Sequence, residues 1–191
     1  SIPTNDLTIG YTDFKKVKTL SEGDKQYDII YGVDDQRKLS IYTQGKVKKI
    51  TRYYIENYEE EINSSGNIRK IHYLPGGAVY IENGKDSLLF LYTDYQNNLL
   101  AITDENGNVL ERHSFDPWGN RRNPEDWSQK DSRHVWSLNR GYTMHEHLYE
   151  FGIINMNGRV YDPLTACFFS PDPFVQAPDC LLYTSDAADD L

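Results

Sequence analysis

Short turn sequences recur along the first two thirds of the chain and leave little room for helices between them. Gly and Asn in these turns tolerate the positive φ that tight hairpins require. The runs between the turns, such as KLSIYT and AVYIE, are short, rich in Tyr, Ile, Val and Thr, and several alternate apolar with polar residues. This pattern predicts an all-β fold of consecutive antiparallel hairpins. The turns are GVDDQ (32–36), QG (44–45), NSSGN (63–67), PGG (75–77), ENGKD (82–86), DENGN (104–108) and DPWGN (116–120).

A weak internal repeat supports the same fold. Segments that start at Gly45, Gly66 and Gly107 each place basic and apolar residues in alternation and end in an aromatic residue. One such hairpin cannot bury its apolar face alone, so copies of it must stack. We therefore expect stacked hairpins over residues 1–124.

Composition limits the partners. The formal net charge is −9, and a nucleic-acid backbone or an anionic membrane needs a basic surface, so we predict no nucleic-acid partner. No apolar run approaches the roughly 18 residues of a membrane-spanning helix, so we predict no integral membrane segment. No signal peptide is visible, and we expect the N-terminus to be incomplete because the chain begins at Ser1 without Met.

The hairpin pattern stops after Pro124. Residues 125–139 are polar and do not alternate, so we predict a long loop with at most one helical turn. We expect one short helix near residues 145–150 and a strand at residues 153–156, before an Asn157-Gly158 turn.

The last twelve residues, CLLYTSDAADDL (180–191), break the composition of the rest of the chain. A DNA string that resembles the transposase adapter of short-read libraries can encode most of them, so we expect a non-native tail. The alternative is a genuine acidic tail. Without this tail Cys167 is the only cysteine, and even with Cys180 there is no disulfide framework or zinc spacing.

Residues 140–179 contain the spaced motif GRVYDP…SPDP, and in this they resemble the repeat-associated core of bacterial Rhs/YD-repeat proteins. Residues 88–124 resemble the repeats upstream of such a core. The core-motif residues with a structural role are Gly158, Tyr161, Pro163, Ser170, Pro171 and Pro173.

The resemblance implies an architecture and a function. Repeats coil into a β-shell that encloses a C-terminal toxin domain, the core plugs one end, and several family members cleave themselves just downstream to free the toxin. It implies a secreted or cell-surface bacterial protein whose partners are its own C-terminal effector and secretion-system or toxin-complex proteins. It implies no cofactor, and it places the end of this chain before the variable toxin domain.

This chain departs from the family pattern at four places. Met144 stands where we expect Gly, and Ala166-Cys167 replaces an expected Gly-Arg. The segment YTDYQNNLLAIT (92–103) replaces the usual turn of the repeats, and the downstream cleavage run is absent. The lost Gly-Arg predicts a weaker turn and compromised self-cleavage.

The two Asp-Pro steps of the core segment, Asp162-Pro163 and Asp172-Pro173, raise the question of catalysis. Two close carboxylates can share a proton and act as acid and base. The resemblance assigns one active acid to Asp172. Asp162 is a local candidate for the second, and Arg159 could hold one of them ionised. The alternative is that both steps are turns, because Asp accepts backbone hydrogen bonds and Pro fixes φ.

Other candidate sites are weaker. His145-Glu146-His147 has two possible ligands but no third, so we predict no metal site. Glu59, Glu60 and Glu61 suggest a solvated face or a charged edge strand. Two rival functions remain, namely an adhesive or carbohydrate-binding module that uses faces such as Trp118, and an autoprotease complete within this chain. We expect the fragment itself not to be an enzyme.

Overall fold

The computed structural model describes residues 7–133, 135–157 and 159–170, and the adapter-like tail lies outside them. The fold is all-β, as predicted, with three antiparallel sheets of eleven, two and four strands. The part of the chain that the structure describes has no helix long and apolar enough to cross a membrane.

The large sheet is a simple meander in which each strand pairs with the next one along the chain. Its strands are β1 (Thr8–Tyr11), β2 (Val17–Glu22), β3 (Lys25–Tyr31), β4 (Arg37–Gln44), β5 (Val47–Ile55), β6 (Tyr58–Asn63), β7 (Ile68–Leu74), β8 (Ala78–Glu82), β9 (Ser87–Thr93), β10 (Leu99–Thr103) and β11 (Val109–Arg112). The two-stranded sheet pairs β12 (Ser114–Phe115) with β13 (Arg121–Arg122).

One five-residue turn recurs six times, at residues 12–16, 32–36, 63–67, 94–98, 104–108 and 116–120. In each, the first N–H donates to the fifth carbonyl and the fourth N–H donates to the first carbonyl. The fourth residue always has positive φ, and it is Gly in three of the turns and Lys15, Asp35 or Asn97 in the others. The unusual segment 92–103 therefore keeps the common turn, because Asn97 tolerates the φ of +66°.

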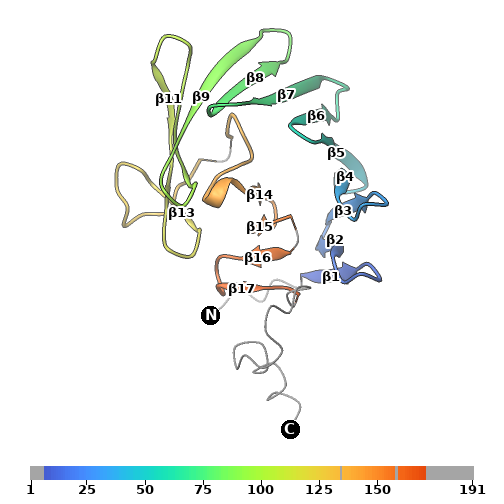
Figure 1. Cartoon of the computed structure of the whole chain (residues 1–191). Coiled ribbons are helices and arrows are strands. Elements are labelled where there is room, and N and C mark those ends of the chain that lie inside the picture. Colours follow the sequence, from blue (N-terminus) through green and yellow to red (C-terminus); the bar gives the residue numbers. More distant parts are fainter. Residues whose placement is uncertain (1–6, 134, 158, 171–191) are drawn as a thin grey trace.

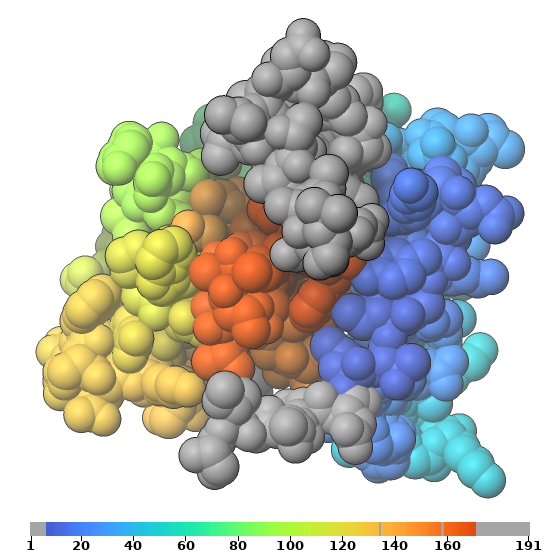
Figure 2. All heavy atoms as spheres, turned by 90° about the horizontal axis from the view of Figure 1, so that it is seen from below, coloured from blue at the N-terminus to red at the C-terminus, as the bar shows by residue number. Residues whose placement is uncertain are grey.

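The large sheet curls into an arc, and the C-terminal part of the chain lies inside it (Figure 1). That part is a four-stranded sheet of β14 (Glu146–Leu148), β15 (Ile153–Asn155), β16 (Val160–Asp162) and β17 (Cys167–Phe168). Viewed from below, β16 and β17 fill the space between the first strands and the segment around residue 125 (Figure 2). We call residues 140–170 the plug.

Two apolar clusters hold the plug inside the arc. In the first, Leu148, Ile153 and Val160 of the plug pack with buried residues of β2–β4 such as Leu20 and Ile29. The second joins Leu138, in the segment before the plug, to buried residues of β7–β10. Fully burying one such side chain contributes about 1.5–3 kcal/mol, so the two clusters account for a stable contact between sheet and plug.

Two local predictions are wrong. The expected helix at residues 145–150 is instead a 3-10 turn, η1 (Tyr142–Met144), followed by strand β14. Thr143 and Met144 both have positive φ, which stops a right-handed helix, and β14 pairs with β15 along a wholly buried strip. The predicted strand at residues 153–156 is confirmed as β15.

The glutamates of β6 are the second error. Glu59 is buried, and β6 is an interior strand between β5 and β7 rather than an edge. Their counter-charges come from Arg140 of the plug and from Arg52 and Arg69 of neighbouring strands. Residues 123–133 and 135–141 lie in no strand or helix.

Candidate functional site

The Asp162-Pro163 step lies in the turn between β16 and β17. The Asp162 carboxylate accepts a hydrogen bond from Leu164 N (2.8 Å) with one oxygen and from the Thr165 hydroxyl (2.8 Å) with the other. Both oxygens therefore serve the local turn. Within the described residues no second carboxylate hydrogen-bonds to Asp162.

The other members of the proposed acid site are placed differently. The Arg159 guanidinium lies 3.8 Å from the centre of the Phe168 ring, a cation–π contact across the small sheet. Asp172, Pro171, Pro173 and Gly158 lie outside the described residues. The structure thus leaves the pairing of Asp162 with Asp172 untested.

The remaining core-motif residues bind the plug together. Tyr161 is buried and its ring centre lies 5.2 Å from that of Phe168. The carbonyl of Pro163 accepts a hydrogen bond from the Asn120 side chain (3.0 Å), which joins the plug to the last repeat turn. Ser170 is also buried.

A buried ionic junction links the plug to the large sheet, and its centre is Glu146 of β14. This carboxylate is 3% exposed and accepts hydrogen bonds from Arg37 of β4 and from Arg52 and Tyr54 of β5. The Arg37 guanidinium also lies 3.8 Å from the centre of the Tyr54 ring. Two guanidinium groups and one phenol thus converge on a single plug carboxylate.

The electrostatics of this junction favour the ionised carboxylate. Burial alone would raise the pKa of Glu146, but the nearby Arg37, Arg52 and Arg140 outweigh it and lower the pKa to about 2. Both partner arginines stay charged, with pKa values raised above the ordinary range by the surrounding negative and phenolic groups despite burial. Removing one partner of such a buried pair typically costs about 3–5 kcal/mol, because it leaves an uncompensated charge.

A second ion pair repeats this arrangement. Arg140 of the plug pairs with Glu59 of β6 and donates to the Tyr73 hydroxyl of β7 (2.9 Å) and to the Met144 carbonyl (3.1 Å). Carboxylates and arginines therefore face each other in both directions across the contact, and this fixes the plug in one register on the sheet.

The histidines beside Glu146 do not form a metal pair. Nε2 of His147 accepts a hydrogen bond from the Tyr142 N–H (3.0 Å), and burial lowers the pKa of His147 well below its usual range, so the ring is neutral. No group of three His, Cys, Asp or Glu side chains in the described segments is placed to hold a metal ion.

Sequence reasoning missed the ionic junction. The only available signal was alternation, because Arg52 falls on the inward face of a strand that otherwise reads as solvated. His145-Glu146-His147 drew attention as possible ligands, whereas the middle residue is the important one. The partner of Glu146 lies 94 residues away in sequence, and nothing local encodes that contact.

The amino-acid sequence was compared with protein-family models and with characterised proteins. No protein-family model matches the chain. It is 33% identical over 95 residues to the tRNA3(Ser)-specific nuclease WapA of Bacillus spizizenii, covering 49% of this chain and 4% of that protein. It is 29% identical over 131 residues to the tRNA nuclease WapA of Bacillus subtilis strain 168, covering 65% of this chain and 5% of that protein. The chain thus spans about a twentieth of the curated relatives it matches.

Solved structures give the fold. The chain superposes on TcdB2-TccC3 with a TM-score of 0.69 at 17% identity, covering 87% of this chain and 9% of that one. It superposes on a Photorhabdus luminescens Tc holotoxin pore structure with a TM-score of 0.70 at 16% identity, covering 90% and 9%. The chain has an Rhs-like shell fold. The fold predicted from the Rhs resemblance is confirmed at that level, and the WapA matches are in line with the resemblance.

Proposed function

We propose that this chain is a wall segment and plug of a shell that encloses a C-terminal effector and presents it for release. In this proposal residues 1–124 form the wall, residues 140–179 form the core segment that contains the plug, and residues 180–191 are not native. The main partner is the C-terminal effector domain of the same protein. A secreted or cell-surface protein that works with a toxin complex or a secretion system agrees with the Tc holotoxin likeness.

One observation carries the proposal. The eleven-stranded sheet curls around the plug (Figure 1), and Arg37 and Arg52 of the sheet bind the buried Glu146 carboxylate of the plug. Two arginines of adjacent strands meet on one plug carboxylate, and loss of such a buried partner is costly, so the plug is held firmly on the sheet. These ion pairs support a plug that stays bound to the sheet until the effector is released. We assign no nuclease activity to this chain, because its net charge is −9 and it matches about a twentieth of the nuclease relatives.

Protease protection in the uninterrupted gene product tests enclosure. Sequencing the source DNA past the codon for Asp179 supplies that gene. We expect the domain downstream of the plug to resist a protease concentration that digests the same domain made alone. Equal digestion of the two would overturn the proposal.

Variants refine that test. Glu146→Ala should loosen the plug and speed digestion of the downstream domain, whereas Glu105→Ala, in an exposed turn, should leave the protection unchanged. If Glu146→Ala does not fold, the comparison of wild type with the isolated domain still decides the question.

We further propose that Asp172 takes part in self-cleavage and that Asp162 mainly forms its turn. The support for Asp172 is the family resemblance, and the support for the role of Asp162 is that both its oxygens are used locally. Asp172→Asn should stop time-dependent shortening of the uninterrupted protein, as followed by intact mass. Unchanged shortening in that variant would contradict the assignment, and shortening of the 191-residue chain itself would favour a complete autoprotease.

A further inference from the structure

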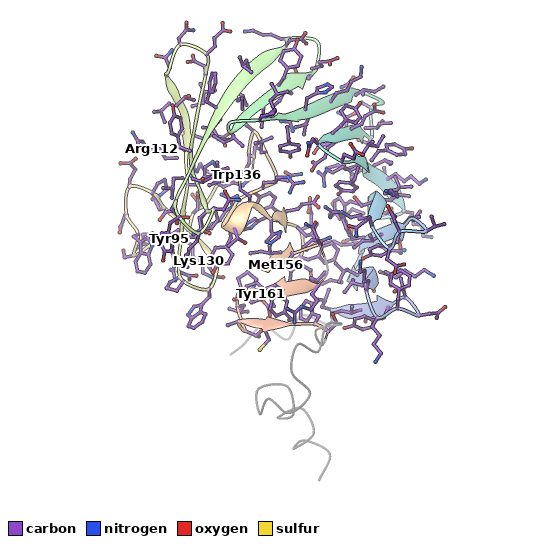
Figure 3. All side chains as sticks on the ribbon, viewed as in Figure 1. Tyr95, Arg112, Lys130, Trp136, Met156 and Tyr161 are labelled. Atoms are coloured by element: carbon purple, nitrogen blue, oxygen red, sulfur yellow. The ribbon has the colours of Figure 1, made fainter. Side chains whose placement is uncertain are left out.

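A cavity of about 1090 Å³, including its open mouth, lies between the plug and the segment that follows the last repeat turn. The plug contributes Leu148, Tyr149 and Ile153 to its lining, and the opposite wall contains Arg121 and Trp136. Trp136 and Lys130 lie on the side of β14–β16 that faces β11 and β13 (Figure 3). The cavity therefore combines apolar side chains with a mixed charged lining, in which the bases Arg121, Lys130 and Arg133 outnumber the acids Asp131 and Glu150.

Arg121 contributes a guanidinium that lies over the rings of Trp136 (4.3 Å), Phe115 (4.9 Å) and Tyr149 (5.4 Å) and pairs with no carboxylate of the described residues. Its guanidinium donates to His113 Nδ1 (2.7 Å), the Arg140 carbonyl (3.3 Å) and the Tyr149 hydroxyl (2.8 Å). All three acceptors are neutral, since burial lowers the pKa of His113. No ion pair among the described residues includes Arg121.

None of the nearby acids among the described residues hydrogen-bonds to Arg121. Asp131 is held by the Arg133 guanidinium at 2.9 and 2.7 Å. Glu111 accepts from the backbone N–H and the hydroxyl of Ser137 at 2.8 and 2.6 Å. Asp131 attracts Arg121 without a direct contact, and Glu150 of the plug also lines the cavity, but no carboxylate of the described residues forms an ion pair with Arg121.

The same wall has donors without acceptors. Arg121 Nε and Trp136 Nε1 are buried and have no hydrogen-bond partner in the part of the chain that the structure describes. The Tyr149 hydroxyl accepts from Arg121, so its own proton can be donated toward the cavity. Lys130, at the rim, makes no side-chain hydrogen bond or ion pair with the described residues. Buried donors in native proteins normally have partners, so this excess of donors points to an absent acceptor.

We propose that this cavity binds a carboxylate carried by an acidic peptide segment with apolar neighbours. A guanidinium without a carboxylate partner, a lysine and a phenol that can donate its proton favour an anion. The apolar wall of Leu148, Ile153 and Pro163 fits side chains next to that carboxylate better than a bare ion. The inference goes beyond enclosure of an effector and does not depend on it, because it can be tested on this chain alone.

The test follows the indole N–H resonance of Trp136 by NMR, assigned with Trp136→Phe. The probes are acetyl-Leu-Glu-Leu-Glu-amide and the matched acetyl-Leu-Gln-Leu-Gln-amide. We expect a saturable shift with the glutamate peptide only. Equal responses to both peptides, or none to either, would overturn the proposal, and an equal response to acetate at the same carboxylate concentration would overturn the choice of a peptide.

Three variants locate the binding. Lys130→Met should weaken binding about two- to fivefold, as expected of a rim charge. Tyr149→Phe keeps the ring but loses the donor, so binding should weaken about tenfold. Lys85→Met, in the exposed 82–86 turn, should bind as wild type, and unchanged spectra elsewhere show that each variant is folded. Wild-type affinity in both Lys130→Met and Tyr149→Phe would contradict the assignment.

Discussion

At the scale of single residues, Glu146 determines how the plug is held. A buried carboxylate is stable only when charges and hydrogen bonds compensate the loss of water, and Arg37, Arg52 and Tyr54 provide both. The sequence lists these residues, but it does not show that they lie close together in the fold. Strand alternation could have marked Arg52 as inward-facing, and no local rule could have paired it with Glu146.

The first prediction concerns Glu146→Gln. Its loss leaves two buried arginines without their carboxylate, so the free energy of unfolding at pH 7 should fall by about 3–5 kcal/mol. The folded-state pKa of Glu146 is about 2, below the usual 4.5. Its contribution is therefore fully present above pH 4.5 and is lost as the pH falls toward 2. The difference between wild type and variant should shrink over that window in urea unfolding.

A matched control is Glu105→Gln, which removes a carboxylate from an exposed turn. It should leave the free energy of unfolding close to that of wild type at every pH. A Glu146→Gln difference that stays constant between pH 5 and pH 2 would show that the junction does not depend on the charge of Glu146.

The backbone angles explain the consequence of two departures from the family pattern. Met144 and Ala166 occupy positions where the resemblance predicts Gly, and the φ angles there are +56° and +58°. Gly adopts such angles freely, whereas a residue with a side chain is strained. Met144 is compensated in part because it packs against the second apolar cluster. Ala166 is exposed and has no such compensation.

We therefore predict that Ala166→Gly raises the free energy of unfolding by about 0.5–1 kcal/mol, since relief of strain outweighs the entropy that Gly adds to the unfolded chain. Ala101→Gly, in the middle of β10, should lower the same quantity by about 0.5–1 kcal/mol, since no strain is relieved there. Urea unfolding of the two variants checks this. A loss of stability in both would mean that the β16–β17 turn is not strained at Ala166.

At the scale of elements, the turns are the best-predicted part of the fold. Four of the six five-residue turns are recognisable from their Gly, Asn and Asp residues and were predicted from these turn motifs. The turns at residues 12–16 and 94–98 were not among them, because neither contains a Gly. Their hydrogen-bond pattern is nevertheless the same, so backbone geometry rather than any one residue defines the repeat.

Burial should decide how much each turn contributes to stability. Asp116 is buried and accepts hydrogen bonds from Trp118 N (3.0 Å), Asn120 N (2.9 Å) and the Arg122 guanidinium (3.0 Å). Asp116→Ala should lower the free energy of unfolding by about 2–3 kcal/mol, since it leaves buried donors unpaired.

Asp104→Ala is the matched control for Asp116→Ala. Asp104 accepts the same two backbone hydrogen bonds but is only half-buried, so water can reach the site and replace the lost acceptor, and the loss of stability should be clearly smaller. Thermal unfolding of the two variants separates them, and equal losses would contradict the role given to burial.

At the scale of the whole molecule, the sequence indicated consecutive hairpins but not how they curve. Periodicity identifies which side chains share a face, yet the arc forms because inward residues of distant strands pack on the same plug. The plug was misread for a related reason. His145–Glu150 has a composition compatible with a helix, and only its pairing with β15 inside the arc makes residues 146–148 a strand.

The acid site illustrates the same limit. Asp162 was recognised from its Asp-Pro step, and the structure places it in the β16–β17 turn with both oxygens engaged. Whether Asp172 approaches it depends on residues outside those described. Local sequence motifs identified the candidates, but their pairing is a property of the folded plug.

The measurement that tests the central claim most directly is amide hydrogen exchange of the plug in the intact 191-residue chain. The account predicts that amides of β14 and β15 open with about the same free energy as those of β3–β5, because plug and sheet form one cooperative unit. Exchange in β14 and β15 that is orders of magnitude faster than in β3–β5 would contradict it. The plug would then not be seated in the sheet, and the enclosing function would lose its structural basis.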